Sequence, residues 1–242
     1  MPQPNQITPA QLLRLIPGSF ALPHDRVDPS LARRIGQRVI VVCQKERKLS
    51  EGVAVLLRAQ GIDAQTLEGG SMAWAASNSP MIPMATLPTT NLWVTRHRPK
   101  IDHVACPWLI RRFVDPNAQF LFVAPSEVAS VADRFNAFPF DIEAVRFNHR
   151  GNGCTFDAMI ADFGLASDAL NRLAIVVPAA DTDRHDHSPQ TAGLIAIFVG
   201  LSRQYRDDLE QLQAGMTPYD ALYRRARDGH DEGHDWPAGR AQ

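Results

Sequence analysis

The amino-acid sequence predicts two parts of different fold class, an α/β N-terminal part with a small parallel sheet and a helix-rich α+β C-terminal part. Three observations predict this division. Strand-like and helix-like segments alternate up to residue 79, helix-like segments predominate from residue 91, and Pro80, Pro83 and Pro88 lie between them. Because prolines at this density interrupt helices and sheets and stiffen a linker, we place the domain boundary there.

The N-terminal elements follow from their local residue patterns. Val39 to Val42 is a run of β-branched residues, which is typical of a buried strand. Ser50 to Gln60 repeats apolar residues at helical spacing, and Gly61 marks its end. The expected elements are a helix over 9–16, a strand over 39–42, a helix over 50–60, a strand over 64–67 and a helical turn over 72–76. This order favours a right-handed βαβ crossover and a parallel sheet.

The C-terminal elements are mostly helical. We expect strands over 92–96 and 118–124, and helices over 107–113, 126–135, 156–163, 168–177, 190–212 and 218–227. The last residues are polar and rich in glycine and proline, which favours a fraying tail. The predicted division is therefore a first domain over 1–79, a linker over 80–90, a second domain over 91–228 and a tail over 229–242.

Composition limits the classes of function. The 242 residues carry a formal net charge of −1, so no concentrated basic surface favours nucleic acid, although DNA binding stays open. The three cysteines form no Cys-x-x-Cys pair, and the N-terminus has no basic, then apolar, secretory pattern. The apolar run over 192–201 is too short to cross a bilayer. We expect a cytoplasmic protein without a membrane partner.

Cys43 follows the predicted strand over 39–42 and precedes a predicted helix. Ligands of parallel α/β sheets bind at this end of a strand, where loop N–H groups and the helix N-terminus favour an anion. Lys45, Arg47 and Lys48 add positive charge beside the thiol. These features favour the reactive thiolate. The alternative is a structural cysteine without chemical function.

The stretch from Cys43 through "EGVAVLLRAQG" to "DAQTLEGGSMAW" resembles the C-terminal half of a rhodanese (sulfurtransferase) domain. The resemblance implies a rhodanese-like fold for the N-terminal domain and a persulfide-carrying catalytic Cys43. It also implies that the loop cradles the thiolate. The loop residues are Gln44, Lys45, Glu46, Arg47 and Lys48. The first half of the rhodanese pattern is compressed, because few residues precede Cys43, so a non-catalytic module is the alternative.

A basic segment and several polar clusters mark the second domain. Arginine forks and helix N-termini suit tetrahedral anions, so we consider an oxyanion site. Its candidate residues are Arg96, Arg98, Lys100 and Arg111. The alternative is a solvated basic strand whose cations pair with acidic residues.

Histidines and carboxylates in "NHRGNGCTFD" and "AADTDRHDH" can ligate a divalent metal. The leading combination is His149, Asp157 and Asp181, because these residues lie beside predicted packed helices, where buried polar groups need partners. Ordinary solvated loops are the alternative. No cofactor is otherwise indicated.

Residues from about Trp93 to about Tyr223 resemble the C-terminal domain of the ChrB chromate-resistance family. The resemblance rests on "WVTRHRPKIDHVACPWLIRRFVDP", "PFDIEAVRFNHRGNGCTFDAMI", "AADTDR", "PQTAGLIAIFVGLSR" and "GMTPYDALY", five blocks in order. It implies a role in chromate resistance, a stress response. We therefore expect the N-terminal domain to carry sulfur from thiosulfate or another donor. We expect the C-terminal domain to bind an oxyanion such as chromate, or a metal. The alternatives are a chromate-responsive regulator and a scaffold. The oligomeric state stays open.

Overall fold

The computed structural model describes residues 6–7, 38–43, 45, 48–77, 79–83 and 86–233. The chain divides into two compact units, Met1–Met81 and Ile82–Gln242. The expected linker over 80–90 spans this division. The helix expected over 9–16 and most of the tail expected over 229–242 lie outside the described residues. Among the helices described, none is long and apolar enough to cross a membrane.

The N-terminal unit contains a three-stranded parallel sheet in the order β1-β3-β2. Its elements are β1 (Gln6–Ile7), β2 (Val39–Val41), α3 (Lys48–Ala59), β3 (Ala64–Leu67) and α4 (Gly70–Ala76). Ala54 and Leu57 of α3 are buried against the sheet together with Ile62 and Ala64. Gly61 follows α3 at φ 78°, a backbone conformation that glycine adopts without strain. The small parallel sheet predicted for this part is thus present.

The C-terminal unit is helix-rich and holds a second parallel sheet in the order β5-β4-β6. Its strands are β4 (Leu92–Arg96), β5 (Gln119–Val123) and β6 (Phe138–Pro139). Its helices are α5 (Ile101–Leu109), which continues into a π-turn over Ile110–Val114, a 3-10 turn over Pro125–Glu127, α6 (Val128–Phe135), α7 (Thr155–Asp162), α8 (Asp168–Asp181), α9 (Thr191–Gln204) and α10 (Asp208–Asp228). The predicted helix-rich α+β class is confirmed for this unit.

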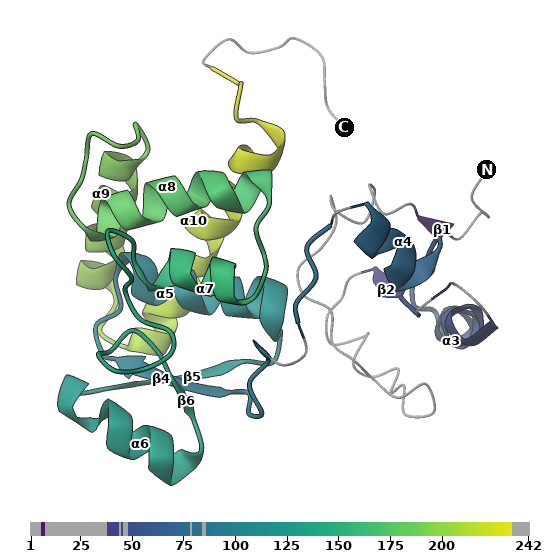
Figure 1. Cartoon of the computed structure of the whole chain (residues 1–242), viewed down its shortest axis with the longest axis horizontal. Coiled ribbons are helices and arrows are strands. Elements are labelled where there is room, and N and C mark those ends of the chain that lie inside the picture. Colours follow the sequence, from purple (N-terminus) through teal and green to yellow (C-terminus); the bar gives the residue numbers. More distant parts are fainter. Residues whose placement is uncertain are drawn as a thin grey trace. The chain divides into compact units, whose positions relative to one another are not determined.

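Alternating side chains of the central strand β4 separate two apolar layers. Trp93 belongs to the large core formed with α5, α7, α8, α9 and α10, whereas Val94 packs with Val128 and Ala132 of α6. Successive residues of a strand point to opposite faces, so this single strand serves both layers. Figure 1 shows α6 on one side of the sheet and the other helices on the opposite side.

Three predicted helix boundaries are wrong. The helix expected over 190–212 is two helices, because α9 ends at Gln204 and Asp207 caps α10 by accepting hydrogen bonds from Leu209 N and Glu210 N. The helix expected from Pro107 begins at Ile101 and contains the proline. The helix expected over 218–227 is part of α10, which contains Pro218. At Pro107 tertiary packing outweighs the local signal, since α5 is almost entirely buried. At Asp207 the deciding contacts are local, within the first turn of α10.

Candidate metal centre

Polar side chains converge at the carboxyl edge of the C-terminal sheet. Asp102 and His103 follow β4 in the first turn of α5, and Asp141 follows β6. His149 comes from the loop before α7, and Asp181 is the last residue of α8. Because β4 and β6 are neighbouring parallel strands, the segments that leave them emerge at the same edge, where α/β sheets place ligands.

The imidazole of His149 lies among three carboxylates. Its Nε2 is 3.3 Å from Asp102 Oδ2, 3.1 Å from Asp141 Oδ1 and 3.6 Å from Asp181 Oδ2. One nitrogen of His149 is therefore surrounded by oxygens of three carboxylates.

Two of these carboxylates are buried almost completely. The side chains of Asp102 and Asp141 are 0% and 1% exposed. Burying a carboxylate is costly unless positive charge or hydrogen bonds compensate it. Asp102 Oδ1 lies 2.9 Å from His103 Nδ1, yet it accepts no hydrogen bond of acceptable geometry. Asp102 thus carries an incompletely satisfied, buried oxygen on the side that faces His103.

His103 and Arg96 contact the outer oxygens of the two buried carboxylates. His103 lies between Asp102 Oδ1 and Asp141 Oδ2. Arg96 donates through Nη2 to Asp141 Oδ2 at 3.0 Å, and its Nε is 3.1 Å from His103 Nε2. His103 Nε2 can accept from Arg96 only when it is unprotonated. When protonated, it faces Asp141 as the donor.

The start of α7 orients the inner oxygens. Thr155 Oγ1 donates to Asp141 Oδ1 at 2.7 Å, and Thr155 N donates to Asp102 Oδ2 at 3.4 Å. Two non-glycine residues here have positive φ angles, 57° at Asp141 and 22° at Ile101. Such backbone strain accumulates at functional sites, where the surrounding structure sustains it.

The protonation equilibria of the cluster are coupled. The contact with Asp102 is the largest influence on His149; burial opposes its protonation, but the charges of Asp102, Asp141 and Asp181 outweigh burial and raise the pKa of His149 to about 9. Burial opposes protonation of His103, but Asp102 and Asp141 outweigh it and raise its pKa to about 9. Burial, with Asp102 nearby, raises the pKa of Asp181 to about 7. Burial would raise the pKa of Asp102, but His103 and His149 hold it well below its usual range.

Two overlapping sets of side chains have the spacing of metal ligands, with their atoms within 4.8 Å of one another. One is Asp102, His103 and Asp141, and the other is Asp102, His149 and Asp181. The second set lies nearer solvent, because His149 is 39% exposed whereas His103 is 14% exposed. An ion held by this second set would therefore keep an accessible side.

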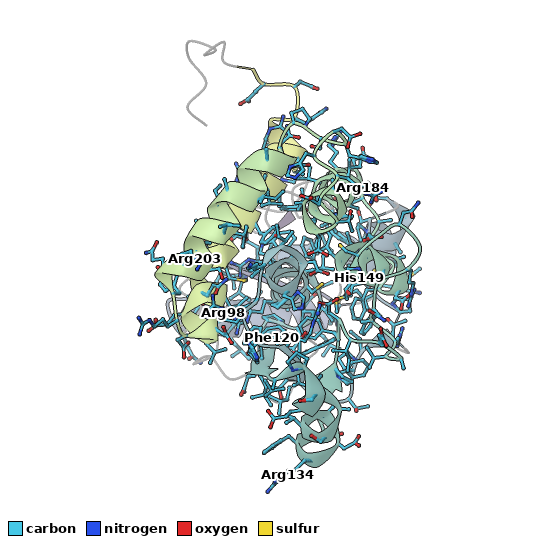
Figure 2. All side chains as sticks on the ribbon, turned by 90° about the vertical axis from the view of Figure 1, so that its left-hand side faces the viewer. Arg98, Phe120, Arg134, His149, Arg184 and Arg203 are labelled. Atoms are coloured by element: carbon cyan, nitrogen blue, oxygen red, sulfur yellow. The ribbon has the colours of Figure 1, made fainter. Side chains whose placement is uncertain are left out.

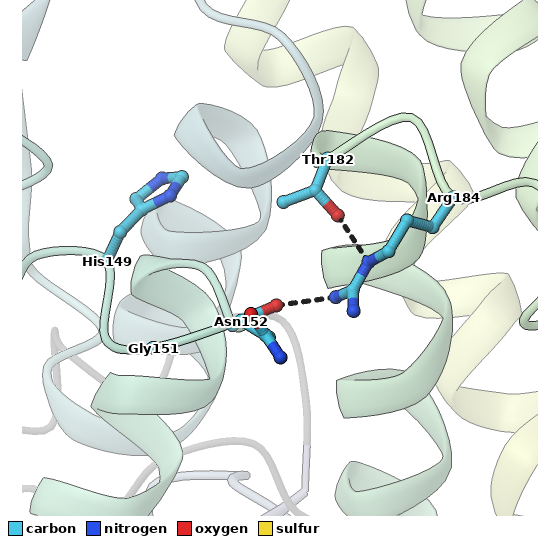
Figure 3. A pocket seen from close by; sticks show the side chains of 6 residues that line it. His149, Gly151, Asn152, Thr182 and Arg184 are labelled. Atoms are coloured by element: carbon cyan, nitrogen blue, oxygen red, sulfur yellow. Dashed lines mark hydrogen bonds between the residues drawn. The ribbon is translucent and has the colours of Figure 1, made fainter.

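A hollow of about 260 Å³ adjoins His149. It is lined by His149, Gly151, Asn152, Gly153, Thr182 and Arg184. Figure 3 shows His149 and Arg184 on opposite sides of it. Arg184 donates through Nε to Thr182 Oγ1 at 2.9 Å and through Nη2 to the Asn152 carbonyl.

The structure brings together only part of the metal set predicted from sequence. His149 and Asp181 lie in the cluster, but Asp157 belongs to neither ligand set. Its Oδ1 instead accepts a hydrogen bond from Cys154 N at 2.6 Å, which caps α7.

Sequence reasoning missed Asp102, His103 and Asp141. The available signal for Asp102 and His103 was their position soon after the predicted strand over 92–96.

The side chains predicted to bind an oxyanion have separate partners. Arg96 donates to Asp141. Arg98 donates to the carbonyl of Ser202. Arg111 donates to the carbonyl of Ala118 and lies over the ring of Phe120. Lys100 is exposed. Figure 2 shows Arg98 on the side of the unit opposite to His149 and Arg184. Only Arg96 contacts the cluster.

Cys43 follows β2, as predicted, and is partly buried. Its sulfur lies 3.1 Å from Ser50 Oγ in the first turn of α3. Lys45 and Lys48 are exposed, whereas Gln44, Glu46 and Arg47 lie outside the described residues.

Cys106 and Cys154 are fully buried, and burial raises the pKa of both thiols. Neither has the environment of a reactive thiolate.

Comparison with known proteins assigns the C-terminal unit. Residues 93–226 match the family model described as "ChrB, C-terminal domain". The chain is 33% identical over 132 residues, 54% of its length, to "Protein ChrB" of Cupriavidus metallidurans, and this match covers 39% of that relative. No solved structure matches the chain. Since the family model covers more than half of its residues, the chain belongs to the ChrB C-terminal domain family.

Proposed function

We propose that the C-terminal unit binds one divalent transition-metal ion through Asp102, His149 and Asp181, and that this ion serves a role in chromate resistance. The resistance role follows from the family. The observation that carries the metal proposal is the placement of His149 Nε2 3.1–3.6 Å from three carboxylate oxygens.

These separations match those of atoms bound to a common ion. Ligand atoms about 2.1 Å from a metal lie roughly 3.0 Å apart in octahedral and 3.4 Å apart in tetrahedral coordination. Mixed imidazole and carboxylate ligands suit divalent ions such as Mn²⁺ and Zn²⁺. The burial of Asp102 supports the same proposal, because a buried carboxylate that also binds an ion is better compensated.

The local charges favour a single ion. Without metal, the three aspartates are balanced by Arg96 and by the protonated forms of His103 and His149. In the proposed set a divalent ion displaces the proton of His149 and lies among the three aspartates, with Arg96 and His103 as their outer partners. A second ion would add uncompensated positive charge beside Arg96.

The residues around the ion have distinct tasks in this proposal. His103, Arg96 and Thr155 hold the buried carboxylates in place, as outer partners of metal ligands commonly do. The ion supplies Lewis acidity to an oxygen ligand that enters from the exposed side. His149 and Asp181 define that side.

Elemental analysis after equilibrium dialysis of the full chain against Mn²⁺ or Zn²⁺ tests the proposal. We expect one ion per wild-type chain and severe loss in His149→Ala. Thr155→Val, which removes an outer partner, should weaken binding about 10–100-fold. His185→Ala is the matched control, because this exposed histidine contacts Asp183 outside the cluster. A metal-free wild type, or equal binding by His149→Ala, contradicts the proposal.

A second proposed activity is sulfur transfer at Cys43. The supporting observation is its position after β2 and before α3, with the Ser50 hydroxyl 3.1 Å from the sulfur. A hydroxyl that donates to sulfur stabilises the thiolate, which is the nucleophile in sulfur transfer.

Mass spectrometry after thiosulfate treatment tests this second activity. We expect a persulfide on Cys43 in the wild type, no adduct in Cys43→Ser, and a reduced yield in Ser50→Ala. The buried Cys106 and Cys154 serve as internal controls and should remain unmodified. An unmodified Cys43 with a demonstrably free thiol eliminates the sulfur-carrier role.

A further inference from the structure

The hollow beside His149 has the features of a ligand site on the exposed side of the metal centre. It adjoins the ligand set through His149 and lies next to Asp181 through its neighbour Thr182. Of the side chains that line it, Arg184 carries a permanent positive charge and none is a carboxylate. The carboxylates lie on the side of the metal ligands.

The guanidinium of Arg184 is held in place by neutral partners. Thr182 Oγ1 and the Asn152 carbonyl accept two of its hydrogen bonds, so further N–H groups remain for a ligand. By contrast, Arg96, Arg112 and Arg150 each face an aspartate. In the described part of the chain, no carboxylate forms an ion pair with Arg184. An arginine that is fixed but not neutralised is suited to an incoming anion.

The two sides of the hollow offer different partners for an anion. His149, a ligand of the proposed ion, lines one side, and Arg184 lines the other. An anion between the Lewis-acidic ion and the guanidinium would have a partner at each of its ends.

The placement of the partners distinguishes classes of anion. The hollow has a volume of about 260 Å³, with His149 and Arg184 on opposite sides (Figure 3). A ligand must therefore have an oxygen group at each end to use both partners. A short dicarboxylate carries a carboxylate at each end and meets this condition.

We propose that this hollow binds a short dicarboxylate, with one carboxylate on the metal ion and the other on Arg184. The inference rests on the proposed metal site, because the ion supplies one of the two partners. It assigns to Arg184 a role as the ligand-orienting residue. Thr182 and the Asn152 carbonyl position its guanidinium.

Calorimetric titration of the full chain with succinate tests this inference, using protein with and without saturating Mn²⁺. We expect saturable binding to the Mn²⁺-loaded protein and at least tenfold weaker binding to metal-free protein. Arg184→Gln should weaken succinate binding at least tenfold while it retains Mn²⁺. Arg203→Gln, at an exposed arginine of α9 outside the hollow, is the matched control and should behave as wild type.

Two further measurements separate the alternatives. Thr182→Val keeps the charge of Arg184 but removes its anchor, and should cause a smaller loss of succinate affinity. Sulfate and phosphate should bind more weakly than succinate, and tighter binding of either overturns the ligand class. Unchanged affinity in Arg184→Gln, or no succinate binding by Mn²⁺-loaded wild type, overturns the site. Failure of wild type to take up Mn²⁺ contradicts the proposed function itself and removes this inference with it.

Discussion

At the scale of single residues, Asp102 links the two histidines of the centre. Its Oδ1 lies beside His103 and its Oδ2 beside His149, and its side chain has no access to solvent. These contacts explain why both imidazoles bind protons more tightly than free histidine. In the metal-free protein, imidazole protons supply the positive charge that the ion supplies in the proposed metal-bound protein. Metal and protons therefore compete for the same carboxylates.

This competition predicts an unusual pH dependence of metal binding. Because the pKa of His149 is raised to about 9, its proton opposes the metal at neutral pH, and affinity should rise with pH until about 9. An ordinary histidine would stop competing above about pH 7. Equilibrium dialysis with Mn²⁺ at pH 6, 7 and 8 measures this effect, with proton release detected by calorimetry in different buffers. Constant affinity between pH 7 and 8 contradicts the prediction.

At the scale of elements, close packing of α10 against α5 and α9 holds the first turn of α5 in position. Tyr219 of α10 donates to the Ile101 carbonyl at 2.7 Å, directly before Asp102. Gly215 lies one turn earlier in α10, where a Cβ atom would be 2.7 Å from Val104 Cγ1 and 3.0 Å from Phe198 Cε1. The absence of a side chain at Gly215 therefore lets the helices approach.

Gly215→Ala should destabilise the protein by about 1–3 kcal/mol, because an added methyl group overpacks this contact. Gly200→Ala on α9 is the matched control, since its Cβ would meet nothing within 4 Å. That change should stabilise the helix by up to about 1 kcal/mol through its higher helix propensity. Urea unfolding curves of both variants measure the difference. Equal stability of the two variants argues against close packing at Gly215.

At the scale of the whole molecule, the proposed activities lie in different units. Cys43 belongs to the unit Met1–Met81, and the candidate metal centre belongs to the unit Ile82–Gln242. Each unit has its own sheet and apolar cluster. Binding at the centre should therefore stabilise the C-terminal unit specifically, since a ligand stabilises the folded state that binds it.

Metal at 100 times its dissociation constant should raise the unfolding free energy of the C-terminal unit by about 2.7 kcal/mol. Trp93 and Trp108, both fully buried in this unit, provide a fluorescence signal for its unfolding. Denaturant titrations with and without Mn²⁺ measure the shift. His149→Ala should show none, and Cys43→Ser should respond as wild type does. A shift that persists in His149→Ala would place the ion elsewhere.

Much of the fold was predictable from local patterns. The β-branched run before Cys43 and the helix that ends before Gly61 correctly indicated a strand and a helix of the first unit. The strands at 92–96 and around 119–123 were also predicted. One failure lay where distant packing acts, at Pro107, which the buried helix α5 accommodates. Another lay at Asp207, a local helix cap that divides a continuous apolar pattern.

By itself, the sequence determined the helix-rich class and family of the C-terminal unit, and it indicated His149 and Asp181 as candidate ligands. Only the tertiary structure identified Asp102, His103 and Asp141, and assigned Asp157 to a helix cap. The physical reason is that β6 has two residues, too few for a readable pattern. Its pairing with β4 nevertheless brings Asp141 to residues about forty positions earlier in the chain. A buried carboxylate is recognised by the charges that surround it, and those charges come together only when the sheet forms.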